Sequence, residues 1–171
     1  TAREMILASS VNARIHICHV STEGSAAEIR FAKSRGVKVT CETAPHYFML
    51  TDELLAKRDA DYRMNPPLRT PKDVRAIIDA VKDGTIDCII TDHAPHAAEE
   101  KADFEKAPNG VVGLETSLAA TLTALYHTGE ISLNRVVELM CVNPRKLLGL
   151  EVPAIQPGKT ADLVIADINR K

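Results

Sequence analysis

Three short apolar runs constrain the fold of this chain more than any other feature. They lie near 14–20, 37–42 and 86–91, and a segment with a helical pattern follows each of them. Almost wholly apolar strands that alternate with helices are typical of a parallel sheet covered on both faces. The sequence therefore predicts an α/β fold in which the three runs form parallel strands.

Helix start and stop signals separate the runs. Ser21 and Thr22 can cap a helix that Gly36 ends, and Thr70 followed by Pro71 begins a helix that Gly84 ends. In the second of these segments, apolar residues fall at the i, i+3, i+4, i+7 spacing of an amphipathic helix. Further helices are predicted over 51–58, 118–129 and 132–140 and from 143, with a polar loop over 94–113 and a turn and strand over 158–167. Loops as long as 94–113 are usually functional.

Length and composition exclude several classes of protein. A complete eight-stranded βα barrel needs about 250 residues, so a chain of 171 residues is a small open α/β domain or part of a barrel. With 21 basic and 23 acidic residues, the chain lacks the basic surface of a nucleic-acid binder. No apolar run approaches the roughly 20 residues of a membrane helix. Four cysteines without CxxC spacing favour reduced thiols in a cytoplasmic protein.

Polar residues of ligand type gather where each run ends. His19 follows the first run, His46 the second, and Asp92, His93 and His96 the third. The carboxyl ends of parallel strands meet at one edge of a sheet, where sites are built. A single histidine at a strand end is more often structural, but together these residues are the ligands that zinc prefers. We therefore expect His19 and Asp92 to lie at the same sheet edge.

Three strings carry a resemblance to a known family: HVST at 19–22, MNPPLR at 64–69 and TDHAPH at 91–96. They resemble the type I dihydroorotases, which belong to the amidohydrolase superfamily of metal-dependent (β/α)8 barrels. The tail, QPGKTADLVI at 156–165, resembles the strand by which that superfamily returns to a small β-domain. The resemblance implies that residues 1–150 supply barrel strands six to eight and that residues 151–171 lead to the β-domain.

The resemblance also implies roles for single residues. It makes His19 a ligand of the more buried of two metals, and Asp92 a ligand of the other metal and the catalytic proton shuttle. It makes Asn65, His96 and Gly110 substrate-binding residues. It implies two divalent metals, zinc first among them, and hydroxide made available by a metal at neutral pH. The implied reaction interconverts N-carbamoyl-aspartate and dihydroorotate in pyrimidine synthesis.

The other metal ligands of that family are missing from the sequence. Because the chain opens at Thr1 without an initiator Met, we expect a fragment of a longer protein with an incomplete metal site. Such a fragment is expected to be inactive alone, and either to bind the N-terminal portion of its parent or to self-associate. His93 is expected to orient Asp92.

Two alternatives remain open. The first is a cyclic amidohydrolase of hydantoinase or allantoinase type, which the pairing of Asn65 with His96 disfavours. The second is a noncatalytic, dihydroorotase-like scaffold for aspartate carbamoyltransferase. The presence of both His19 and Asp92 argues against the loss of metal ligands that such inactive copies show.

Overall fold

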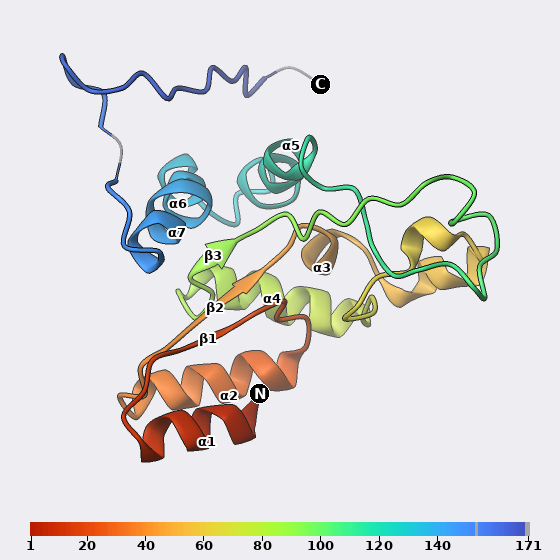
Figure 1. Ribbon diagram of the computed structural model, residues 1–171, viewed down its shortest axis with the longest axis horizontal. Helices are drawn as coiled ribbons and strands as arrows, with labels where there is room; N and C mark the ends of the chain where they lie inside the picture. The colour runs from red at the N-terminus through yellow and green to blue at the C-terminus, as the bar shows by residue number, and fades with distance from the viewer. Residues whose placement is uncertain (153, 170–171) are drawn as a thin grey trace.

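Three parallel strands form the centre of the molecule in the computed structural model, which describes residues 1–152 and 154–169 (Figure 1). The strands are β1 (Ile15–Ile17), β2 (Val39–Thr43) and β3 (Cys88–Ile89), in the order β1-β2-β3. In the register, Ile15 lies opposite Val39, and Glu42 lies opposite Cys88. The predicted parallel α/β arrangement is confirmed.

Two of the strands end earlier than the apolar runs suggest. His19 and Asp92 adopt positive φ angles of 55° and 48°, beyond the ends of β1 and β3. The left-handed region is incompatible with the extended pleat of a strand. The chain therefore cannot continue as a strand through either residue, and β1 and β3 end two and three residues before them, at Ile17 and Ile89.

Helices and single turns connect the strands and follow the last one. Thr22 and Thr70 cap α2 and α4 as predicted, because their hydroxyls accept the backbone N–H groups of Ser25 and Asp73. The helix expected over 51–58 is instead a 3₁₀ helix, and those over 118–129 and 132–140 each continue into π-helical turns. The bounds are α1 (Ala2–Ser10), α2 (Glu23–Ser34), α3 (His46–Met49), η1 (Asp52–Lys57), η2 (Ala60–Tyr62), α4 (Pro71–Lys82), α5 (Ser117–Thr121), η3 (Leu122–Tyr126), α6 (Leu133–Val137), η4 (Glu138–Val142) and α7 (Asn143–Leu147).

The two faces of the sheet differ in character. Along β2, Val39, Cys41 and Thr43 are buried, whereas Thr40 and Glu42 point to the other face and are only half-buried. Side chains in a strand alternate between faces. The buried face packs against α2 and α4 and forms the core with residues such as Ile29, Ile77, Val81, Ile86, Leu125 and Leu139. The sequence predicted cover on both faces, but the face that carries Thr40 and Glu42 remains partly open.

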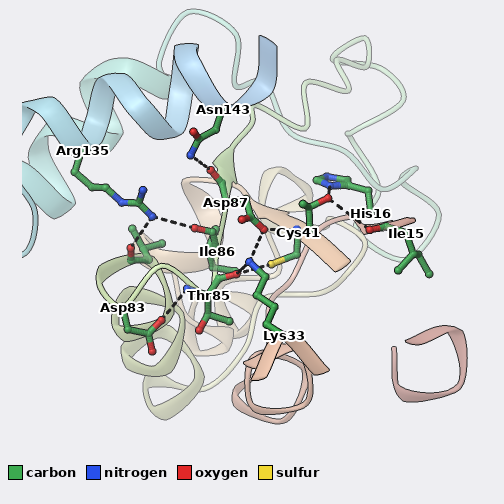
Figure 2. A network of polar contacts seen from close by, with 12 residues as sticks. Ile15, His16, Lys33, Cys41, Asp83, Thr85, Ile86, Asp87, Arg135 and Asn143 are labelled. Carbon is green, nitrogen blue, oxygen red and sulfur yellow. Dashed lines mark hydrogen bonds and ion pairs between the residues drawn. The ribbon is translucent and has the colours of Figure 1, made fainter. Parts of the chain in front are cut away.

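A polar network ties the beginnings of the strands together (Figure 2). The Lys33 ammonium lies 2.7 Å from the carboxylate of Asp87 and donates to the carbonyl of Thr85 at 2.8 Å. The same carboxylate accepts the backbone N–H of Cys41 at 2.8 Å, and Asn143 donates to the Asp87 carbonyl. This network joins α2, β2, β3 and α7 at the end of the sheet opposite the polar clusters.

The C-terminal segment runs away from the sheet along the helices α5 to α7 (Figure 1). The strand predicted over 158–167 is not formed: Leu163, Val164 and Ile165 are exposed, and a strand is stable only when a neighbour pairs with its backbone. Residues 153 and 170–171 of the predicted 151–171 tail lie outside the described residues. Among residues 1–152 and 154–169, no helix has both the length and the apolar character needed to cross a membrane.

Candidate functional site

The side chains of His19 and Asp92 meet at the carboxyl edge of the sheet. Nε2 of His19 lies 3.3 Å from Oδ1 of Asp92, and both side chains are largely shielded from solvent. Their backbones account for two of the four non-glycine residues with positive φ in the described chain. Strained backbone of this kind is concentrated at functional sites. The sequence-based expectation of a shared edge is confirmed.

His46 is the second imidazole against the Asp92 carboxylate. It begins α3, is 6% exposed, and places Nε2 3.7 Å from Oδ2 of Asp92. Burial lowers the pKa of His46 to about 4, so its ring is neutral at pH 7. Nε2 is buried without a hydrogen-bond partner. A buried polar atom without a hydrogen-bond partner lowers the stability of the fold. The position of His46 is therefore better explained by a functional role than by stability.

Glu42 extends the cluster along β2. One of its carboxylate oxygens lies 3.8 Å from Nε2 of His19, and the other lies 3.1 Å from Nε2 of His16. The sequence analysis assigned no role to Glu42 or to His16. The alternation of residues along β2 could have predicted a role for Glu42. Residues two apart in a strand share a face, so Glu42 lies on the same open face of the sheet as Thr40.

The loop over 94–113 carries His96 and Gly110 side by side. The His96 ring lies 3.1 Å from the carbonyl oxygen of Asn109, and the Gly110 N–H donates to the Arg63 carbonyl at 2.9 Å. A Cβ at Gly110 would lie 2.9 Å from the His96 ring, so only glycine permits this approach. His96 and Gly110 line one cavity of about 490 Å³, together with Asp59, Asp61 and Lys101.

Lys101 anchors this loop from within. Its ammonium donates to the carbonyls of Ala60, Pro108 and Gly110 at 2.8–3.1 Å, and the carbonyl of Arg63 lies 3.4 Å away. Burial lowers the pKa of Lys101. The sequence analysis missed this residue, because a lone lysine in a polar loop shows no pattern.

Asn65 lies on a separate loop and is exposed. Two contacts tie that loop to the site: the Tyr47 hydroxyl donates to the Pro66 carbonyl at 2.9 Å, and Arg69 donates to the Ser21 hydroxyl at 3.4 Å. Within the described residues, the Asn65 side chain makes no hydrogen bond to either the His19–Asp92 pair or the His96–Gly110 pair. The structure therefore brings four of the five predicted residues together in two pairs.

His93 does not face Asp92 as expected. Its Nδ1 accepts the backbone N–H groups of Gly113 and Leu114 at 3.1 and 3.2 Å. An imidazole nitrogen that accepts two N–H groups holds the loop in place. His46 instead provides the imidazole that contacts the Asp92 carboxylate.

The donor set at this edge fits a divalent cation. Two ligand atoms on one tetrahedral zinc ion, each about 2.0–2.2 Å from the metal, stand about 3.4 Å apart. The Nε2–Oδ1 distance of 3.3 Å between His19 and Asp92 matches that spacing. Two protein ligands are fewer than the three that a catalytic site needs.

The sequence as a whole matches one family model. The model describes the amidohydrolase family, and it covers residues 3–171. This chain belongs to the amidohydrolase family. Enzymes of this family generally depend on metal ions, and His19 and Asp92 place a nitrogen and an oxygen donor side by side at the carboxyl edge of the sheet.

Curated proteins of similar sequence include several dihydroorotases. The chain is 52% identical over 171 residues to the dihydroorotase of Acetivibrio thermocellus and 52% identical over 168 residues to that of Geobacter metallireducens. The matches cover 99% and 98% of this chain but only 40% and 39% of those relatives. The chain thus spans about two-fifths of the length of the dihydroorotases it matches.

Solved amidohydrolase structures share the fold. The L-hydantoinase (dihydropyrimidinase) of Arthrobacter aurescens matches with a TM-score of 0.81 at 34% identity, over 86% of this chain and 34% of its own. The dihydropyrimidinase of Brevibacillus agri matches with a TM-score of 0.82 at 30% identity, over 87% and 34%. Both are cyclic amidohydrolases by name, so the three-stranded unit described here belongs to that barrel type.

Proposed function

We propose that this chain supplies barrel strands six to eight of a dihydroorotase, with residues 1–150 in the barrel and 151–171 leading to a small β-domain. The observation that carries the proposal is the meeting of His19 and Asp92 at 3.3 Å, at the carboxyl ends of β1 and β3. The 52% identity to curated dihydroorotases supports this substrate over those of the more distant hydantoinases.

His19 would hold the more buried of two divalent metals and Asp92 the other, and their nitrogen and oxygen donors suit zinc. When bound, such a cation acts as a Lewis acid toward an amide carbonyl and provides a hydrolytic nucleophile at neutral pH. The remaining ligands would come from the barrel strands that this chain does not contain.

Asp92 moves the proton of the reaction. Hydrolysis of the cyclic amide adds the oxygen of water to the carbonyl carbon and breaks the C–N bond, and the leaving nitrogen needs a proton. The Asp92 carboxylate can take that proton from water and deliver it to the nitrogen. The neutral His46 ring lies beside this carboxylate, with Nε2 3.7 Å from Oδ2.

Asn65, His96 and Gly110 bind the substrate. Dihydroorotate carries a carboxylate and a ring with amide N–H and C=O groups, so it needs both donors and acceptors around it. His96 presents its ring on one cavity wall beside Gly110, whose carbonyl keeps a second lone pair besides the one that Lys101 uses, and Asn65 adds an amide from another loop. Lys101 holds that wall in place.

The two free edges of the sheet indicate where a partner chain would bind. Within the described residues, β1 and β3 each pair only with β2, so each leaves one edge free. Unpaired strand edges bind other chains. We propose that the N-terminal portion of a dihydroorotase occupies these edges, and that the isolated chain self-associates through them.

A reconstitution experiment tests the proposal. This chain would be co-expressed with the part of the Acetivibrio thermocellus dihydroorotase that lies outside the match, and the complex would be assayed with dihydroorotate, a substituted hydantoin and allantoin. We expect hydrolysis of dihydroorotate by the complex and by neither part alone. Hydrolysis of the hydantoin or of allantoin, without hydrolysis of dihydroorotate, would overturn the assignment of dihydroorotate as the substrate. A metal-loaded complex with no activity would favour a noncatalytic scaffold.

A further inference from the structure

A second group of ligand-type side chains lies on the open face of the sheet. Its members on and just after β1 precede His19 in the sequence. His16 and Cys18 are two residues apart in sequence, and Glu42 projects from β2 beside them, because His16 pairs with Thr40 in the register. One ligand atom from each of the three residues lies within 4.8 Å of the other two. The group therefore offers a nitrogen, a sulfur and an oxygen to one point.

Hydrogen bonds prepare His16 to act as a ligand. Its Nδ1 lies 2.8 Å from the hydroxyl of Thr40, which in turn donates to the Ile15 carbonyl at 3.5 Å. In the tautomer that carries the proton on Nδ1, the ring donates to this hydroxyl and leaves the Nε2 lone pair free for a metal ion. Nε2 lies 3.1 Å from the Glu42 carboxylate, a spacing that a shared metal ion can bridge in place of a proton. Ligating histidines usually have the other nitrogen fixed in this way.

The thiol decides which cation the group favours. A metal ion that binds the Cys18 thiol displaces its proton to solvent. Thiolate ligands select zinc, cadmium and similar metals, whereas magnesium and calcium prefer oxygen donors alone. Three protein ligands leave the fourth position of a tetrahedral ion open.

A cavity gives the group access to solvent. It has a volume of about 560 Å³ and is lined by His16, Thr40 and Glu42, with side chains of β3 and α7 across from them. A cation with an open fourth position can therefore reach the group from outside and coordinate water there.

We propose that His16, Cys18 and Glu42 form a second cation site, which binds a thiophilic divalent ion such as Zn²⁺, Cd²⁺ or Co²⁺ and excludes Mg²⁺. The site is separate from the His19–Asp92 pair, because it uses the face of the sheet instead of its carboxyl edge. Glu42 links the two, since its second oxygen lies 3.8 Å from His19. The inference does not depend on the proposed dihydroorotase activity.

Cobalt titration of the 171-residue chain tests the proposal. Co²⁺ bound by a thiolate gives a charge-transfer absorption that imidazole and carboxylate ligands do not, so we expect this band to appear and to saturate at one equivalent. The Cys18→Ser variant should lose the band, and the His16→Gln variant should bind at least about tenfold more weakly. Excess Zn²⁺ or Cd²⁺ should abolish the band, whereas excess Mg²⁺ should leave it.

Two matched controls assign the band to this site. Cys141→Ser removes a thiol that does not belong to the group, and His19→Asn removes the proposed catalytic ligand; both variants should keep the band. Circular dichroism of Cys18→Ser verifies that the variant is folded. No saturable band in the unmodified chain, or a band that survives Cys18→Ser, would overturn the second site. Either result leaves the reconstitution experiment, which measures turnover, unaffected.

Discussion

Nε2 of His19 and Oδ1 of Asp92 lie 3.3 Å apart, although the two residues follow different strands and do not belong to neighbouring strands of the sheet. β2 separates β1 from β3, and the chain turns inward at both residues through positive φ angles of 55° and 48°. Residues forced into the left-handed region cost about 1–2 kcal/mol each. The fold accepts that cost at the two positions where the side chains must converge.

The Asp92→Asn variant is expected to abolish catalysis in the reconstituted enzyme without unfolding it. An amide cannot accept and return a proton, and loss of a general acid–base group lowers kcat by about 10²–10⁴-fold. Steady-state kinetics and circular dichroism measure the two effects. Asp79→Asn, the same change on the exposed side of α4, is the matched control and should keep full activity. Near-normal turnover by Asp92→Asn would show that another group shuttles the proton.

The His96→Ala variant is expected to weaken substrate binding while leaving the metal content unchanged. His96 lies beside Gly110, on the wall of the 490 Å³ cavity, and has no contact with the His19–Asp92 pair among the described residues. KM for dihydroorotate should therefore rise while metal analysis of the complex stays constant. A loss of metal with an unchanged KM would place His96 among the ligands instead.

The Gly110→Ala variant should displace the loop that carries His96. The added Cβ would lie against the Ala94 carbonyl and 2.9 Å from the ring of His96, and neither the backbone nor the ring can yield without moving the loop. Overpacking of this kind typically costs about 1–3 kcal/mol. Urea unfolding measures the change. Gly24→Ala, on α2 with open space around its Cβ, should be neutral or slightly stabilising. Equal stabilities for the two variants would mean that the loop adapts freely.

The Lys101→Met variant should loosen the loop over 94–113 by removing the hydrogen bonds that anchor it. Methionine keeps the length of the side chain but leaves the carbonyls of Ala60, Pro108 and Gly110 without their donor. A lost set of charge-assisted hydrogen bonds is worth at least about 1.5 kcal/mol, or roughly tenfold in local opening. Hydrogen exchange of the Gly110 N–H should therefore accelerate at least about tenfold. Lys106→Met, a change at an 85% exposed lysine, should leave that exchange rate unchanged.

The helices and the sheet edge could be predicted because their signals are local. Thr22 and Thr70 cap their helices through contacts three residues away, and the order of strands and helices requires a parallel sheet. From that sheet, the convergence of His19 and Asp92 follows directly. The resemblance carried by the HVST, NPPLR and DHAPH strings then named the same two residues.

The contacts missed by the sequence analysis depend on tertiary packing. His46 reaches Asp92 because the short helix α3 turns back over the sheet edge, and Lys101 finds its carbonyls because three loop segments fold around it. The strand predicted over 158–167 failed for the opposite reason. Its residues have the apolar, partly β-branched composition of a strand, but pairing is a property of two segments, and no described neighbour pairs with this one.

Glu130 should make stability depend on pH at the acid limit. Ion pairs with Arg75 at 2.5 Å and Lys82 at 2.6 Å hold the segment after η3 against α4 and lower the pKa of Glu130 from 4.5 to about 2. A carboxyl with a depressed pKa in the folded state binds its proton more readily when the chain is unfolded. Its stabilising contribution is therefore complete above pH 4.5 and is lost as the pH falls from 4.5 through about 2.

Urea unfolding of the Glu130→Gln variant across this pH range measures the effect. The variant should be less stable than the unmodified chain at pH 7, and the difference should shrink as the pH falls below 4.5, because protonation removes the same charge that the substitution removes. Glu28→Gln, at an exposed position on α2, is the matched control and should run parallel to the unmodified chain at every pH. A Glu130→Gln difference that stays constant between pH 7 and pH 2 would show that packing of the side chain, and not its charge, accounts for the stabilisation.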